Sequence, residues 1–181
     1  MPYFSRVIYN MKFSVSLKDQ TPIEVDAETL TASDALTALG IKAIDKVVAA
    51  KINGESRDLS SLVGNGSELE PIFLESEEGL EILRHSTAHV MAMAVREIFP
   101  GVKVTIGPSI ENGFYYDFDY ERPFKPDDLP VIEEKMKQII KENHPFNRVE
   151  ISSAEALERF KSEKEDYKVE IIDIIIPMMK F

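Results

Sequence analysis

The stretch 11-MKFSVSLKDQTPIEV-25 decides the fold of the first part of the chain. Phe13, Val15 and Leu17 alternate with polar residues, and this period of two is typical of a half-buried strand. A polar turn at 18–20 separates them from a second alternating segment. The stretch therefore predicts a β-hairpin at the start of the fold.

The residues after this hairpin indicate a small α+β domain. Thr31 or Ser33 is suited to cap a short helix, and Gly40 is suited to end it. The other segments are short apolar runs bounded by turn residues: a strand at 47–52, a helical turn at 59–62 and a strand at 69–74. The predicted order ββαββ leaves one helix to cover one face of a sheet.

The second part of the chain is also predicted to mix helices and strands. Ser76 is suited to cap a long helix that runs to about Phe99. Asn112-Gly113 is a turn signal between two apolar segments. The predicted elements after the long helix are strands at 102–110 and 114–118, a helix from Asp127 or Asp128 to Asn143, a short strand at 149–151, and a helix capped by Ser152 or Ser153. Both parts thus predict the α+β class.

Composition excludes several kinds of function. The 181 residues include 21 Lys and Arg against 32 Asp and Glu, a net charge of −11, and no Cys. Cysteine-ligated metal sites and cysteine nucleophiles are therefore excluded. The acidic balance argues against DNA as a partner, and any other nucleic-acid contact is expected to be local. No apolar run approaches the ~20 residues of a membrane span, and the first ten residues do not resemble a signal peptide. We therefore expect a cytoplasmic protein with no membrane partner.

The most informative short motif is Arg84-His85-Ser86-Thr87-Ala88-His89 on the predicted long helix. A spacing of four places His85 and His89 on one helix face, about one turn apart. Such a pair can orient a water molecule or weakly hold a metal ion. A zinc-protease motif requires Glu after the first His, and Ser86 excludes it. The alternative is an exposed helix face that merely carries both imidazoles, and we predict no metal site beyond these two weak candidates.

Two further groups are candidates for a substrate pocket. The hairpin residues Asn112, Gly113, Phe114 and Tyr115 are suited to line a pocket, and the alternative role for them is core and turn structure. Lys168 is suited to hold an anionic or carbonyl group, and its alternative role is a solvated surface charge.

Taken in chain order, these motifs resemble the N-terminal region of bacterial threonyl-tRNA synthetases. After an extension at 1–11, residues 12–74 resemble the TGS domain, a ubiquitin-like β-grasp module. Residues 77–181 resemble the editing domain without its C-terminal part. The matching motifs are Ala50-Lys51-Ile52-Asn53-Gly54-Glu55, the run from Glu78 to His89, Ile106-Gly107-Pro108, Asn112-Gly113-Phe114-Tyr115-Tyr116-Asp117 and Tyr167-Lys168-Val169.

The resemblance implies an activity. The editing domain of this family hydrolyses serine wrongly attached to tRNA(Thr), because one methyl group gives only ~1–3 kcal/mol of discrimination by binding. Carried over, His85 and His89 orient or activate the water, Lys168 contacts the substrate or the tRNA terminus, and the hairpin at 112–115 shapes the pocket. The implied partner is the acceptor end of tRNA(Thr), in a family whose members are homodimers.

Departures from the family limit what is expected of this chain. In the family, the second half of the editing site contains a cysteine, and this half has no counterpart here. The ligase domain, which binds ATP, Mg and Zn in the family, has no counterpart here either. We therefore expect no cofactor on this chain and no ligase activity from it alone. The ending Ile174 to Phe181 departs from the family's acidic continuation, which suggests a truncated reading frame. The alternatives are a non-enzymatic TGS-containing module that binds tRNA or a partner, and a trans-editing hydrolase completed by another subunit.

Overall fold

Two groups of elements make up the computed structural model, which describes residues 10–145 and 149–178. They divide between Leu83 and Arg84. Helices and strands occur in both groups, which is compatible with the predicted α+β class. The predicted extension at 1–11 falls largely outside the described residues.

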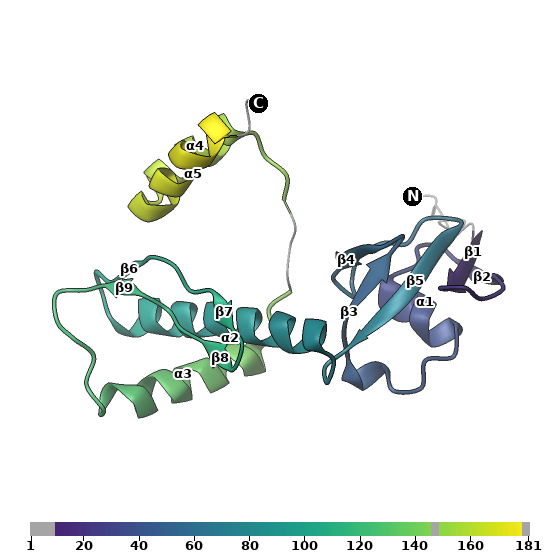
Figure 1. Ribbon diagram of the computed structural model, residues 1–181, viewed down its shortest axis with the longest axis horizontal. Helices are drawn as coiled ribbons and strands as arrows, with labels where there is room; N and C mark the ends of the chain where they lie inside the picture. Colours follow the sequence, from purple (N-terminus) through teal and green to yellow (C-terminus); the bar gives the residue numbers. More distant parts are fainter. Residues whose placement is uncertain (1–9, 146–148, 179–181) are drawn as a thin grey trace, which may run out of the picture. The chain divides into compact units, whose positions relative to one another are not determined.

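A five-stranded mixed sheet forms the first unit, in the order β2-β1-β5-β3-β4 (Figure 1). The central strands β1 and β5 are parallel, and the other neighbours are antiparallel. The predicted hairpin is confirmed, because Phe13 on β1 pairs with Val25 on β2. The strands are β1 (Met11–Leu17), β2 (Ile23–Ala27), β3 (Val47–Ile52), β4 (Glu55–Arg57) and β5 (Ser67–Phe73).

Helix α1 (Ala32–Ala38) supplies the core of this unit with Leu36, which packs in one buried cluster with Val15 and Leu69 of the sheet. Thr31 rather than Ser33 is the N-cap, since its side chain accepts a hydrogen bond from the Asp34 N–H. The predicted stop at Gly40 is confirmed, because a φ of +88° favours glycine over residues that carry a Cβ.

Strand β4 was not predicted from the sequence, because three polar residues carry no strand signal. It pairs with β3 across the predicted turn, where Asn53 and Gly54 both have positive φ. Such a turn matches the right-handed twist of its strands. The 3₁₀ turn Ile44–Lys46 was not predicted either.

The helical turn predicted at 59–62 is wrong. Residues 58–61 form a single turn in which the Ser61 N–H donates to the Asp58 carbonyl, and Leu62 forms an isolated antiparallel bridge with Thr31. Leu62 is 68% exposed, so it does not provide the buried helical face that its spacing from Leu59 suggested.

Helix α2 (Glu77–Ile98) begins where the sequence predicted. The Ser76 hydroxyl accepts a hydrogen bond of 3.0 Å from the Gly79 N–H, which confirms the N-cap. Gly79 also permits a close approach of two backbone segments, because a Cβ there would lie 2.0 Å from the Phe73 carbonyl oxygen. The helix start therefore requires glycine at this position.

An irregular hairpin follows α2, so the predicted hairpin is confirmed while its two long strands are wrong. Only short ladders form, β6 (Lys103–Val104) with β9 (Phe118–Asp119) and β7 (Ser109–Ile110) with β8 (Gly113–Phe114). Gly107-Pro108 interrupts the first arm, since proline has no N–H to donate to a ladder.

Helix α3 (Asp128–Glu142) packs Ile132 and Ile139 into one buried cluster with Val95 of α2 and with Phe99, which follows that helix. It ends at Asn143, as the sequence predicted, and this residue has the left-handed conformation. No helix among the described residues is both long and apolar enough to span a membrane.

Helices α4 (Ser153–Ser162) and α5 (Asp166–Met178) pack on each other. Ser152 caps α4 in a capping box with Glu155, which decides between the two predicted caps. The strand predicted at 149–151 is wrong, because these residues form no ladder. Val149 and Ile151 have β-branched side chains, which favour strands, but both are exposed and neither is in a strand.

Candidate functional site

The two histidines of α2 form a direct pair. The Nε2 atoms of His85 and His89 lie 3.0 Å apart, and the two rings meet edge to face with centroids 4.5 Å apart. At this distance one ring donates an N–H to the other, so at least one imidazole is neutral. Both side chains are exposed, and water can reach them.

The surroundings of His89 favour its neutral form. Partial burial lowers its pKa below the usual 6.5, and the nearby charges of His85 and Lys168 lower it further. At neutral pH its ring is therefore available to accept a proton. A neutral imidazole near water is the usual form of a general base.

Lys168 lies at the start of α5, close enough for its charge to act on His89. Its ammonium is 3.4 Å from Glu165 Oε2 and 5.2 Å from the centre of the Phe160 ring. The tertiary structure thus brings together three candidates that lie up to 83 residues apart in the sequence.

Glu165 is a charged residue that sequence reasoning missed. It is only 8% exposed, and Arg96 approaches its Oε1 atom to 2.6 Å while Lys168 faces the other oxygen. In the sequence it stands within the charged run 161–166, which reads as a solvated surface. Nothing in that run distinguishes the one carboxylate that becomes buried.

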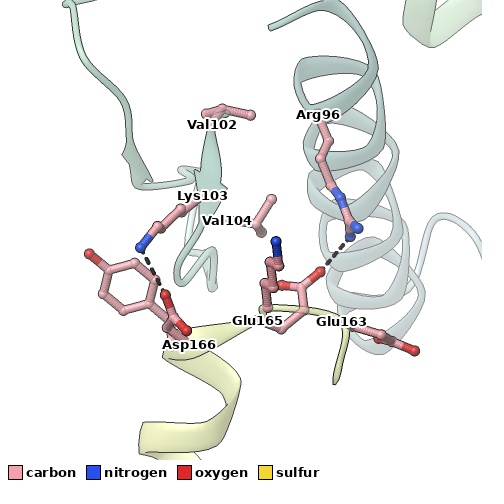
Figure 2. Close-up of a pocket in the computed structure, with 9 residues that line it drawn as sticks. Arg96, Val102, Lys103, Val104, Glu163, Glu165 and Asp166 are labelled. Carbon is pink, nitrogen blue, oxygen red and sulfur yellow. Dashed lines mark hydrogen bonds and ion pairs between the residues drawn. The ribbon is translucent and has the colours of Figure 1, made fainter. Parts of the chain in front are cut away.

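A small cavity of about 110 Å³ lies beside this carboxylate. Figure 2 shows Arg96 reaching Glu165 and Lys103 reaching Asp166, the latter at 2.8 Å. The charged groups that line the cavity therefore largely neutralise one another. The lining residues are Arg96, Val102, Lys103, Val104, Glu163, Lys164, Glu165, Asp166 and Tyr167, and the predicted site residues are not among them.

The predicted pocket residues at the hairpin tip are not joined to the histidines. Asn112 and Tyr115 are exposed, and Gly113 and Phe114 are half-buried in β8. Within 10–145 and 149–178, no hydrogen bond or ring contact links any of these four to His85 or His89.

Tyr116, in the same hairpin, faces inward. Its ring stacks on Phe118 with centroids 5.1 Å apart. Burial raises its pKa, and the negative charge of Glu165 adds to this. The hairpin thus approaches the Glu165 carboxylate through Tyr116.

A metal-binding role gains no support from the described part of the chain, where no three His, Cys, Asp or Glu side chains are grouped to hold an ion. Two imidazoles alone are fewer protein ligands than a catalytic zinc site uses. The arrangement is suited to proton transfer and to stabilising a negative charge.

No protein-family model matches the chain, but curated relatives do. It is 52% identical over 156 residues to a threonine–tRNA ligase of Lawsonia intracellularis, which covers 83% of this chain and 24% of the relative. The match to that of Oleidesulfovibrio alaskensis is 49% over 166 residues, or 91% and 25%. For Marinobacter nauticus it is 47% over 149 residues, or 82% and 23%. The chain spans about a quarter of the length of these relatives.

Proposed function

We propose a function from one premise: this chain is a homologue of about one quarter of a threonine–tRNA ligase, with 47–52% identity over most of its own length. We assign it to the N-terminal region of such an enzyme. Its proposed activity is the hydrolysis of seryl-tRNA(Thr), the product of a misacylation. The observation that carries this proposal is the His85–His89 contact of 3.0 Å with a neutral His89.

The domain assignment follows the motifs. Residues 12–74 are proposed as a β-grasp TGS domain, which is supported by a mixed sheet with one helix on it and parallel central strands. Residues 77–181 are proposed as a part of an editing domain, because they carry the histidine pair and Lys168. Aminoacylation, with its ATP and metal ions, is assigned to regions of the relatives that this chain does not match.

The proposed mechanism is hydrolysis of the aminoacyl ester by water. His89 accepts a proton from the water while the water oxygen attacks the ester carbonyl. His85 hydrogen-bonds to His89 and orients its ring. Lys168 stabilises the negative charge that develops on the carbonyl oxygen, and the tRNA 3′-terminal oxygen leaves with the proton that His89 took from the water.

The proposed partner is the acceptor end of tRNA(Thr). Because a net charge of −11 disfavours broad contact with a polyanion, the contact is assigned to a small area around Lys168. This predicts weak, local tRNA binding by the chain alone.

The test is deacylation of seryl-tRNA(Thr) by the purified chain and by His85→Ala, His89→Ala and His144→Ala. We expect His89→Ala to lower the rate by about 10²- to 10⁴-fold, the usual contribution of a general base. His144 is the matched control, since it pairs with Glu142 at the end of α3. Threonyl-tRNA(Thr) is assayed as a second substrate to measure specificity, and we expect the chain not to hydrolyse it.

If all variants deacylate seryl-tRNA(Thr) at the same rate, His85 and His89 take no part in the mechanism. Binding of tRNA without turnover would favour the non-enzymatic module, and turnover only after adding another subunit would favour the trans-editing hydrolase.

A further inference from the structure

The face of α2 that carries the histidines continues to Arg96. Arg96 follows His89 by seven residues, which is two helical turns, so both side chains leave the helix on the same side. Arg96 reaches the Glu165 carboxylate at 2.6 Å. One helix face therefore carries both the imidazole pair and the cation that fixes Glu165.

Glu165 in turn fixes the start of α5. Its backbone carbonyl accepts hydrogen bonds from the N–H groups of Lys168 and Val169, and its own N–H donates to the Phe160 carbonyl. Its second carboxylate oxygen faces the Lys168 ammonium at 3.4 Å. The Phe160 ring, 5.2 Å away, also contacts this ammonium.

We infer that Glu165 is a positioning residue: anchored by Arg96, two helical turns beyond His89, its carboxylate holds the Lys168 ammonium on the side of α2 that carries the histidine pair. A free lysine side chain has four rotatable bonds and would otherwise spread over many conformers. A carboxylate shared by two cations limits this spread. The inference rests on the proposed function only where it gives this arrangement a role in hydrolysis.

Charges facing His89 come from two elements. His85 lies on its own helix, and Lys168 lies on α5. Without the Glu165 charge, Lys168 loses its counter-ion and is repelled by Arg96, so its ammonium moves into solvent. The positive charge near His89 then weakens, and the His89 pKa rises toward its usual value.

The test is NMR titration of the histidines in the full chain, comparing wild type with Glu165→Gln, Lys168→Met and the double variant. We expect the His89 pKa to rise in each single variant and to rise no further in the double variant, because both act through one contact. Glu163→Gln is the matched control, since this neighbouring carboxylate pairs with Arg159 at the surface and should leave His89 unchanged.

An unchanged or lowered His89 pKa in a folded Glu165→Gln protein would overturn the inference. Lys168→Met removes the other partner of the same contact, which is the more exposed one. If the His89 pKa does not rise in this variant, the inference is also overturned. This readout needs no activity, so it stays decisive even if the chain hydrolyses nothing. Where hydrolysis occurs, we expect Glu165→Gln to lose on the order of 10²-fold in rate, the effect of a small misplacement.

Discussion

Gly107 lies directly under the ring of Tyr116, where a Cβ atom would stand 2.0 Å from the ring Cδ2 and 2.5 Å from Cγ. Because Cγ lies close to the backbone, the ring cannot swing aside by a small rotation. The irregular hairpin therefore depends on glycine at this position, because any larger residue would displace the Tyr116 ring.

Replacing Gly107 with Ala should displace the Tyr116 ring from its stack on Phe118. We expect a loss of about 1–3 kcal/mol in the free energy of unfolding, as for other overpacked sites. The displaced ring is more solvated, so its pKa should fall back toward 10.0. Urea denaturation and an ultraviolet tyrosine titration measure the two effects. Gly64→Ala is the control, since a Cβ there meets only Ser67 Oγ at 3.7 Å; equal losses in both variants would contradict the expectation.

Replacing His85 with Ala should raise the pKa of His89 part of the way toward 6.5. Burial, the largest cause of the lowered value, and the Lys168 charge both remain. Histidine NMR measures the shift. The wild-type protein should also lose stability as the pH falls below 6.5, because the unfolded chain then binds a proton at His89 more readily than the folded chain does. A His89 that titrates at or above 6.5 in the wild type would disprove the account.

Arg122 holds the carboxylate of Asp128 at the start of α3, with contacts of 2.7 and 3.0 Å. Together with the Lys125 N–H it lowers the pKa of Asp128 from 3.8 to about 2. The stability that this gives is present above pH 3.8 and is lost as the pH falls through about 2. In Arg122→Ala we expect the Asp128 pKa to rise and acid unfolding to begin at a higher pH.

Carboxyl-detected NMR and acid titration followed by circular dichroism measure these changes. The rise should be incomplete, because the Lys125 N–H still donates to Asp128 at 2.8 Å. If Asp128 titrates near 3.8 in the wild type, the ion pair does not have the proposed effect.

Leu36 is fully buried between α1 and the five-stranded sheet. Leu36→Ala should lower the free energy of unfolding by about 2–5 kcal/mol, through lost burial and a residual cavity. Leu62→Ala makes the same chemical change at a side chain that is 68% exposed, and it should change stability by less than about 0.5 kcal/mol. Urea denaturation of both variants tests this, and similar losses would argue against the buried cluster.

Short-range rules were enough for much of the fold. The alternation at 11–17, the Asn53-Gly54 turn, the Ser76 cap and the Ser152 cap are local features, and the structure has each of them. Two of the errors arose where long-range pairing decides. Strand β4 exists because β3 is beside it, and the segment 149–151 has β-branched residues yet is in no strand of the described part of the chain.

The candidate site divides in the same way. The sequence by itself determined the His85–His89 pair, since a spacing of four on a helix brings two side chains together wherever the helix lies. Only the tertiary structure decided that Lys168 acts on His89 and that Glu165 is buried between Arg96 and Lys168. The physical reason is that the charge on a residue is visible in the sequence, while its burial and its partners depend on how distant helices pack.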